Sequence, residues 1–284
     1  MSKGSCLCGD LAWETTAPLE LASHCHCGIC RKVHGATFTS YAAAPKGGLR
    51  WLRGDGSASR YESSPGFFRH FCGRCGSKVP GPPGEDGRVF LPLGSLEGDP
   101  EVRPLAHIFA GSKAPWHVWT DSLPRFDTWP PGIDAPPQPS PVRKGPADGR
   151  AGGSCLCGAV AYAVDGPLTF MRNCHCSRCR KARGAAHATN APVELPRLHW
   201  LRGEDRLQSY KIPEARFFAQ VFCVQCGSPA PRMDPSRNLA VVPAGSLDHA
   251  PDARVAEHIF ADSKAPWFEI TDTLTRHAEA PPSR

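Results

Sequence analysis

The chain has 284 residues, of which 40% are hydrophobic and 21% are charged, and its formal net charge is +6. This composition is typical of a soluble globular protein, and at roughly 150 residues per domain the length predicts about two domains. No apolar run approaches the ~20 residues that span a bilayer, and the N-terminus lacks the apolar core of a secretory signal, which predicts a cytoplasmic protein without a membrane segment.

The chain contains one unit twice. The hexapeptide GSCLCG occurs at 4–9 and again at 153–158, an offset of 149 residues that later becomes 151. A repeating unit of about 125 residues indicates tandem duplication of a domain rather than a short solenoid repeat. The other matching segments are CHCGIC (25–30) with CHCSRC (174–179), WLRG (51–54) with WLRG (200–203), FCGRCGS (71–77) with FCVQCGS (222–228), GSL (94–96) with GSL (245–247), HIF (107–109) with HIF (258–260), and SKAPW (112–116) with SKAPW (263–267).

The repeat also sets the domain boundaries, which we predict at 1–126 and 151–278. The segment 127–150 is rich in proline, glycine and small polar residues and has no hydrophobic period. Such a segment buries too little apolar surface to order itself, so we interpret it as a semi-extended linker. A fused pair of domains could reproduce the interface of an ancestral homodimer, and the chain would then be a monomer with intramolecular domain pairing.

Most periodic segments are short and are typical of β-strands, with Gly, Pro, Ser and Asp between them. The basic stretch after each CHCxxC motif could form one helical turn, and a short helix is expected just before SKAPW. The fold class is therefore mainly β, with a small core that structural metal would stabilise. In chain order the predicted strand segments are 11–15, 36–44, 49–54, 59–63, 66–72 and 88–96 in the first copy, and the second copy opens with 159–164 and 185–193.

Fourteen cysteines divide evenly between the copies. A disulfide framework would be unusual in a chain without an export signal, because the cytosol keeps thiols reduced. A C-x-C pair is also poorly placed to bridge itself. The spacings C-x-C, C-x-C-x2-C and C-x2-C therefore indicate metal ligands.

The seven sulfurs of each copy are too few for two closed zinc sites. Zinc takes thiolates in tetrahedral geometry, and a structural site is closed by four protein ligands. One site must therefore have three sulfurs, and a site with three protein ligands and an open position is the form that does chemistry. Spacing favours joining the C-x-C of GSCLCG to the C-x2-C of FCGRCGS, where Gly76 permits close backbone approach, although it also permits other partitions and a non-cysteine ligand.

Metal also changes the charge balance. Four thiolates on one zinc ion carry −2 together and three carry −1, so two sites of each kind contribute −6 and cancel the formal +6. The excess of basic residues is therefore weak evidence for nucleic acid. Neither an aromatic RNA-binding motif nor a sustained basic stripe occurs, so we expect no nucleic-acid partner.

The motifs GSCxCG, CHCxxCRK, FCxxCGS, GSL, HIF and SKAPW, present in both copies, resemble those of the family of glutathione-dependent formaldehyde-activating enzymes. That family also includes a centromere-associated vertebrate protein. The resemblance covers nearly everything except the linker, but the family usually has one copy per chain. It implies two tandem Mss4-like zinc-binding β-rich domains with about four zinc ions per chain, two of them structural and two in open three-cysteine sites.

Carried over residue by residue, the resemblance assigns the ligands of each zinc ion. The open sites are the first triplet (Cys25, Cys27 and Cys30) and the second triplet (Cys174, Cys176 and Cys179). The structural ligands are Cys6, Cys8, Cys72 and Cys75 in the first copy, and Cys155, Cys157, Cys223 and Cys226 in the second.

The resemblance also implies the reaction. At an open zinc site the glutathione thiol would add to formaldehyde, giving S-hydroxymethylglutathione, or the reverse reaction would proceed as a carbon–sulfur lyase. The partners are then a small thiol such as glutathione and a small aldehyde. No catalytic residue beyond the open zinc sites is assigned.

Further candidates for the site are basic residues and histidines. The basic pair after each triplet could bind the carboxylates of glutathione or form a solvated surface. The histidine of each HIF could carry protons at the site or pack in the core. The candidates for substrate contacts are Arg31, Lys32, His107, Arg180, Lys181 and His258.

Two histidines and two tryptophans have simpler interpretations. His26 and His175 each lie between two expected ligands, so we expect them to point away from the metal as partly exposed or supporting residues. Trp116 and Trp267 most simply fill the small core, and the alternative is that they line a ligand pocket.

Two other functions compete with the enzyme. A non-catalytic, zinc-stapled thiol carrier or protein-interaction module fits the centromere-associated relative and the proline-rich tether, which suits bivalent binding. The thiol–aldehyde addition also proceeds without an enzyme. Redox sensing by triplet thiolates is the third hypothesis, but it lacks a resolving cysteine, because the other eight are assigned to closed sites.

Overall fold

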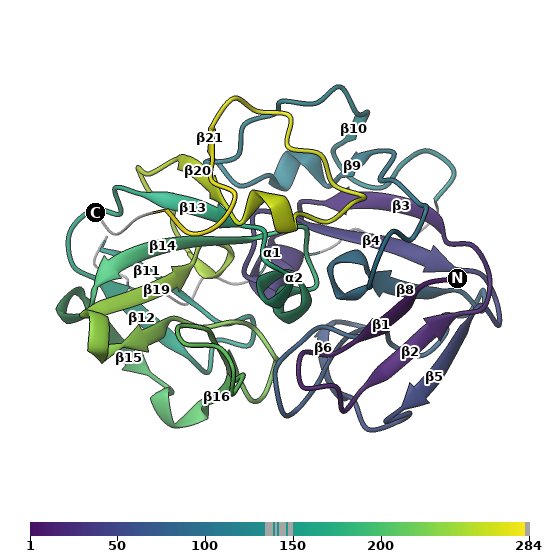
Figure 1. Cartoon of the computed structure of the whole chain (residues 1–284), viewed down its shortest axis with the longest axis horizontal. Coiled ribbons are helices and arrows are strands. Elements are labelled where there is room, and N and C mark those ends of the chain that lie inside the picture. The colour runs from purple at the N-terminus through teal and green to yellow at the C-terminus, as the bar shows by residue number, and fades with distance from the viewer. Residues whose placement is uncertain (134–138, 140, 142–145, 147–149, 282–284) are drawn as a thin grey trace.

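The computed structural model describes residues 1–133, 139, 141, 146 and 150–281, so most of the predicted linker lies outside the described residues. Within this part of the chain the prediction of a mainly β fold is confirmed, because two β-rich halves flank a central pair of short helices (Figure 1). Neither of these helices has the length and apolarity to cross a membrane.

In the described part of the first copy, the strands form three sheets, ordered β1-β2-β5, β10-β9-β3-β4-β8 and β6-β7. Strand β4 lies inside the largest sheet, and its Ala42, Ala43 and Ala44 are fully buried, so small side chains let both faces pack closely. The strands are β1 Lys3–Ser5, β2 Ala12–Thr15, β3 Glu20–Cys25, β4 Thr39–Ala44, β5 Leu49–Arg53, β6 Ser59–Ser64, β7 Phe67–Phe71, β8 Val89–Pro92, β9 His107–Ile108 and β10 Arg125–Phe126.

The described part of the second copy repeats this layout with one extra edge strand, β18. Its sheets are ordered β11-β12-β15, β18-β19-β14-β13-β20-β21 and β16-β17. The strands are β11 Ala151–Ser154, β12 Ala161–Val164, β13 Met171–Cys174, β14 Ala188–Glu194, β15 Leu198–Arg202, β16 Leu207–Lys211, β17 Ala219–Cys223, β18 Arg232–Asp234, β19 Leu239–Pro243, β20 Val255–Ile259 and β21 Thr275–Arg276.

The two α-helices start inside the cysteine triplets. Helix α1 spans Gly28–His34, and the Sγ of Cys27 caps it by accepting a hydrogen bond from the N–H of Cys30 (3.3 Å). Helix α2 spans Ser177–Arg183 and is capped in the same way. Each helix ends at a glycine with positive φ. The basic stretches therefore form about two turns rather than the predicted one, because the capping sulfur starts the helix earlier.

Short 3-10 helices supply several of the remaining turns. The short helix expected just before SKAPW is a single 3-10 turn in each copy, and the GSL motif forms another. The 3-10 helices are η1 Leu93–Ser95, η2 Ala110–Ser112, η3 Leu195–Arg197, η4 Glu204–Arg206, η5 Pro235–Arg237, η6 Ala244–Ser246 and η7 Ala261–Ser263.

The two copies complete each other's cores. Trp267 and Ala265 of the second SKAPW segment pack in the core of the first copy. Trp116 and Ala114 of the first SKAPW segment pack in the core of the second copy. Both tryptophans are buried, so they fill a core as predicted, but the core belongs to the other copy. The copies are therefore interlocked through their C-terminal segments.

A second contact between the copies joins the turns that follow β7 and β17. The rings of Phe71 and Phe222 meet edge to face with centroids 6.4 Å apart. Gly76 has a φ of +71°, and a Cβ there would lie 2.5 Å from the Phe222 ring, so glycine is required for two reasons. Lys78 Nζ donates to the carbonyl oxygens of Gly76 (2.7 Å) and Gly227 (2.5 Å), which ties the two turns together.

Candidate metal centres

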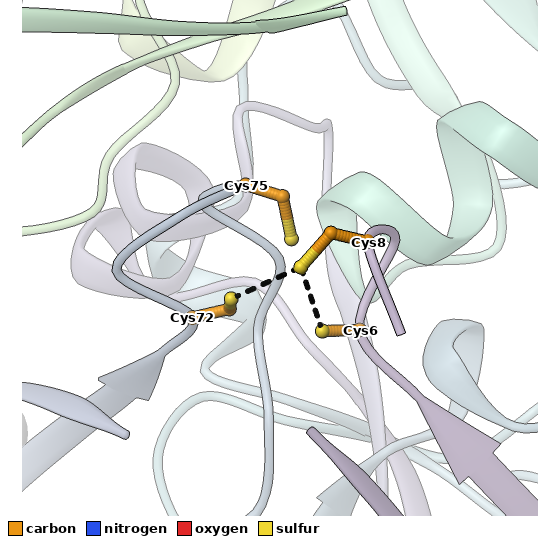
Figure 2. A group of neighbouring side chains, drawn as sticks. All are labelled: Cys6, Cys8, Cys72 and Cys75. Carbon is orange, nitrogen blue, oxygen red and sulfur yellow. Dashed lines mark hydrogen bonds between the residues drawn. The ribbon is translucent and has the colours of Figure 1, made fainter. Parts of the chain in front are cut away.

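The first four-cysteine cluster joins the C-x-C pair of GSCLCG to the C-x2-C pair of FCGRCGS. Cys6 and Cys8 follow β1, whereas Cys72 and Cys75 follow β7, and Figure 2 shows their four sulfurs converging. The Sγ of Cys8 lies 3.4 Å from that of Cys6 and 3.6 Å from that of Cys72. The N–H of Leu7 donates to the Oγ of Ser77 (3.0 Å), which holds the two turns against each other.

The second copy reproduces this cluster. The Sγ of Cys157 lies 3.4 Å from that of Cys155 and 3.8 Å from that of Cys223, and Cys226 completes the group. In both clusters three of the four cysteines are buried and one is partly exposed.

These clusters fit a tetrahedral metal ion and do not fit disulfides. Zn–S bonds of about 2.3 Å place the sulfurs of a tetrahedral site about 3.8 Å apart, which is close to the spacings above. A disulfide would bring two sulfurs to about 2.05 Å, and all fourteen cysteines are free. The predicted exclusion of disulfides is therefore confirmed.

The two triplets form smaller clusters at the N-termini of α1 and α2. The sulfurs within each triplet lie within 4.8 Å of one another. Among the described residues, no further cysteine, histidine or carboxylate side chain joins either group at this distance. The structure thus groups the cysteines of each copy as four and three, in the partition that spacing favoured.

Neighbouring thiols and backbone amides stabilise one thiolate in each triplet. Hydrogen bonds from the thiols of Cys174 and Cys179 lower the pKa of Cys176 to about 3. Hydrogen bonds from Cys25 and Cys30 lower the pKa of Cys27 in the same way. Such negatively charged sulfurs are the form that binds a metal ion.

Behind the first triplet, two buried histidines and a partly exposed aspartate form a hydrogen-bonded chain. Nε2 of His26 is 2.8 Å from Nδ1 of His107, and Nε2 of His107 is 3.0 Å from both carboxylate oxygens of Asp121. Burial lowers the pKa of both histidines, so both are neutral. Because a carboxylate only accepts, His107 donates from Nε2 to Asp121, and His26 donates from Nε2 to His107.

The second copy has the same chain through His175, His258 and Asp272, with distances of 2.8 Å and 3.0 Å. His26 and His175 are fully buried rather than partly exposed, and neither joins a cysteine cluster. His107 and His258 are buried as well, and both line a cavity of about 470 Å³ between the two copies. In each copy this hydrogen-bonded chain of two histidines and an aspartate orients the loop that carries the triplet.

Of the predicted substrate contacts, Arg31 and Arg180 lie beside the triplets. The guanidinium of Arg31 lies 5.8 Å from the ring centroid of Trp116, and both residues line a cavity of about 350 Å³ beside α1. Nε of Arg180 donates to the carbonyl oxygen of His175 (3.1 Å), so this side chain folds back over its own helix.

The two lysines contact the opposite copy. Lys32 is buried and forms an ion pair of 2.6 Å with Asp248. Lys181 forms a more exposed ion pair of 3.0 Å with Glu97. Both ammonium groups therefore take part in the contact between copies.

Sequence reasoning missed Arg69, Tyr41 and the two aspartates of the histidine chains. Nη1 of Arg69 lies 3.9 Å from Sγ of Cys30, and Tyr41 packs against the first triplet. None of these residues belongs to a repeated cysteine motif. For Arg69 and Tyr41 the available signal was a difference between the copies, since the second copy has Gln220 and Asn190 at the equivalent positions.

Comparison with known proteins gives a family. The family model described as "Glutathione-dependent formaldehyde-activating enzyme" matches residues 1–112 and 150–263. A search of curated proteins gave no match. A crystal structure of a Rhodobacter sphaeroides protein is 29% identical, with coverage of 36% of this chain and 91% of that chain and a TM-score of 0.30. Since the two matched segments make up most of the sequence, the chain belongs to the family of glutathione-dependent formaldehyde-activating enzymes.

Proposed function

We propose that this chain is a zinc-dependent enzyme of the carbon–sulfur lyase type that interconverts glutathione plus formaldehyde and S-hydroxymethylglutathione. The observation that carries the proposal is the grouping of seven sulfurs into a four-sulfur and a three-sulfur cluster in each copy. A three-sulfur site has room for one further ligand, and that ligand can be a substrate.

The donor sets suit zinc. Cys6, Cys8, Cys72 and Cys75 would hold one structural ion, and the equivalent cysteines of the second copy would hold another. Each triplet would hold an ion with three sulfur ligands. When bound there, zinc would stabilise a thiolate near neutral pH or polarise an aldehyde oxygen.

The reaction balances without a further reactant. The thiol sulfur forms a bond to the aldehyde carbon, the carbonyl π electrons move to oxygen, and the thiol proton ends on that oxygen. The lyase direction breaks the carbon–sulfur bond and returns the proton to sulfur. The chain of Asp121, His107 and His26 supports this chemistry by fixing the loop between Cys25 and Cys27, and Asp272, His258 and His175 do so in the second copy.

Metal analysis and calorimetry test the proposal. The purified protein should hold close to four zinc ions, two of which a mild chelator removes easily. Glutathione, alone and with formaldehyde, should release heat on binding, and a variant with Cys27→Ser and Cys176→Ser should lose that heat. Formation of S-hydroxymethylglutathione, followed by NMR, should exceed the uncatalysed rate.

Three outcomes would contradict the proposal. Fewer than two zinc ions per chain would remove its metal basis. Binding without any rate above the uncatalysed reaction would leave a thiol carrier, and the absence of heat in both proteins would leave an interaction module.

A further inference from the structure

We propose that the two triplets have different roles: the second triplet is the site at which the external thiol enters, and the first triplet is sealed and holds its ion as a structural element. This inference rests on the proposed function and assigns it to one half of the chain. It is carried by the burial, the covering residues and the charges around each triplet.

Solvent reaches only one of the two triplets. Cys25, Cys27 and Cys30 are exposed by 6%, 2% and 3%. In the second triplet Cys174 is similarly buried, but Cys176 and Cys179 are partly exposed. A thiol as large as glutathione needs a path for its sulfur and for the peptide behind it, so this difference in exposure decides access.

The first turn of each helix shows the same difference. In α1 Gly28 and Ile29 are buried, whereas the equivalent Ser177 and Arg178 of α2 are exposed. A Cβ on Gly28 would lie 2.6 Å from Cδ of Pro141, so Pro141 covers the start of α1 closely.

Aromatic side chains complete the cover over the first triplet. Ile29 belongs to the same buried cluster as its three cysteines, and Tyr41 and Trp129 pack against that cluster. Trp129 meets Phe109 edge to face at 4.9 Å. The second copy has smaller or polar residues at all three covering positions, namely Arg178, Asn190 and Ala280.

The charges around the first triplet also balance without an added ligand. Nη1 of Arg69 lies 3.9 Å from Sγ of Cys30. Three thiolates, one divalent ion and one guanidinium sum to zero, and a neutral group of this kind is stable in a buried place. A glutathione thiolate would add an uncompensated buried negative charge, which is costly. The second copy has the neutral Gln220 at the position of Arg69, and its buried cation is Arg183 of α2, which lies close enough to Cys179 and Cys174 to interact electrostatically.

The second triplet carries further cations nearer the surface. Arg178 is exposed on α2, and Arg232 of β18 is partly exposed and lies close enough to Cys179 to interact electrostatically, although it also pairs with Asp234. The first copy has Ile29 and Gly81 at the positions of Arg178 and Arg232. Exposed guanidinium groups suit the carboxylates of an anionic thiol such as glutathione.

Differential alkylation of the zinc-loaded wild-type protein tests this assignment. Iodoacetamide should modify Cys176 and Cys179 at least tenfold faster than Cys27 and Cys30, as measured by peptide mass spectrometry. Glutathione should protect only the second triplet. Equal protection of both triplets, or protection of the first alone, would overturn the inference while the proposed function stands. If neither triplet is protected and calorimetry shows no heat, the proposed function itself fails.

Exchange of the covering residues gives a reciprocal test. Trp129→Ala should raise the alkylation rate of Cys27 by about tenfold, and Ala280→Trp should lower that of Cys176. Far-UV circular dichroism establishes that each variant is folded. A folded Trp129→Ala variant with unchanged Cys27 reactivity would show that the cover does not control access.

The cations at the second triplet have a separate readout. Arg178→Ile, which introduces the residue of the first copy, should weaken glutathione binding by about three- to tenfold. Binding of the neutral thiol 2-mercaptoethanol should not change. Equal losses for both thiols would contradict a role in recognising carboxylates.

Discussion

Each of the two helices forms an ion pair with the opposite copy. The two pairs join equivalent positions of the repeat, but they differ greatly in their exposure to solvent. Lys32 of α1 reaches Asp248 just after η6, and the two side chains are exposed by 4% and 0%. Lys181 of α2 reaches Glu97 just after η1, and these side chains are exposed by 24% and 54%. The pairing thus occurs in both copies, but one ion pair is buried and the other is partly exposed to water.

The buried ion pair lies on the same helix as the sealed triplet. Lys32 Nζ also donates to the carbonyl oxygens of Ser154 (2.8 Å) and Ser246 (3.2 Å), which satisfies the buried ammonium. Along α1, therefore, the residues at the helix start and at the contact with the second copy are buried, although Gly28, Lys32 and Asp248 also form part of the wall of the 350 Å³ cavity. Along α2, both remain accessible. The elements of the two copies are nearly the same, whereas the burial of the residues on α1 and α2 differs.

The largest effect is expected at the closed clusters, where the copies should behave alike. Cys75→Ser and Cys226→Ser each remove a fully buried ligand. Because metal binding contributes on the order of 10 kcal/mol to the folding of small zinc domains, each variant should lose one zinc ion, and the melting temperature of the interlocked fold should fall by a similar large amount in both. Circular dichroism melts and metal analysis measure both. Cys176→Ser is the control, and its melting temperature should stay near that of the wild type.

The next largest effect on stability is expected at the two ion pairs, which occupy equivalent positions and can be compared directly. Lys32→Met leaves Asp248 buried without its partner and should reduce the free energy of unfolding by about 3–5 kcal/mol. Lys181→Met breaks the exposed pair and should cost about 0–1 kcal/mol. Chemical denaturation gives both values. The double variant Lys32→Met with Asp248→Asn should recover part of the loss, and equal effects of the two single variants would contradict the difference in solvation.

The cysteine pattern allowed much of the site to be predicted. Ligand spacing is local information, and the grouping into four and three follows from tetrahedral coordination, so Cys6, Cys8, Cys72 and Cys75 could be paired from the sequence. The predicted strand segments follow from local β-forming residues. Strand β3 was missed because its segment ELASHC has few β-branched or aromatic residues and ends in ligands.

The exchange of SKAPW segments could not be predicted, because both copies carry the same sequence and either tryptophan fits either core. Only the packing of the copies decides where Trp116 and Trp267 lie. Arg69 and Asp121 were missed for a related reason. A polar residue outside a motif gains its role from what folding places beside it, and only a comparison of equivalent positions such as Arg69 and Gln220 gives a hint of this.

The cavity between the copies provides the smallest and most specific comparison. His117 lines it, and the second copy has Phe268 at the equivalent position. Burial, together with the charges of Lys113 and His107, lowers the pKa of His117 to about 4. An unfolded histidine has a pKa near 6.5, so between these values the unfolded chain binds a proton that the folded chain does not. Stability from this residue is thus complete above about pH 6.5 and is lost as the pH falls toward 4.

The variant His117→Phe should therefore resist acid better than the wild type. Its free energy of unfolding should fall less steeply below pH 6.5, by at most about 1.4 kcal/mol per pH unit, because a single proton is involved. Denaturation series at pH 7, 6 and 5 measure the slope, and the metal sites contribute equally to both proteins. The reciprocal variant Phe268→His places a second histidine in the same cavity. The free energy of unfolding of this variant should therefore fall more steeply with decreasing pH than that of the wild type. A parallel pH dependence in all three proteins would show that His117 titrates as it does in water.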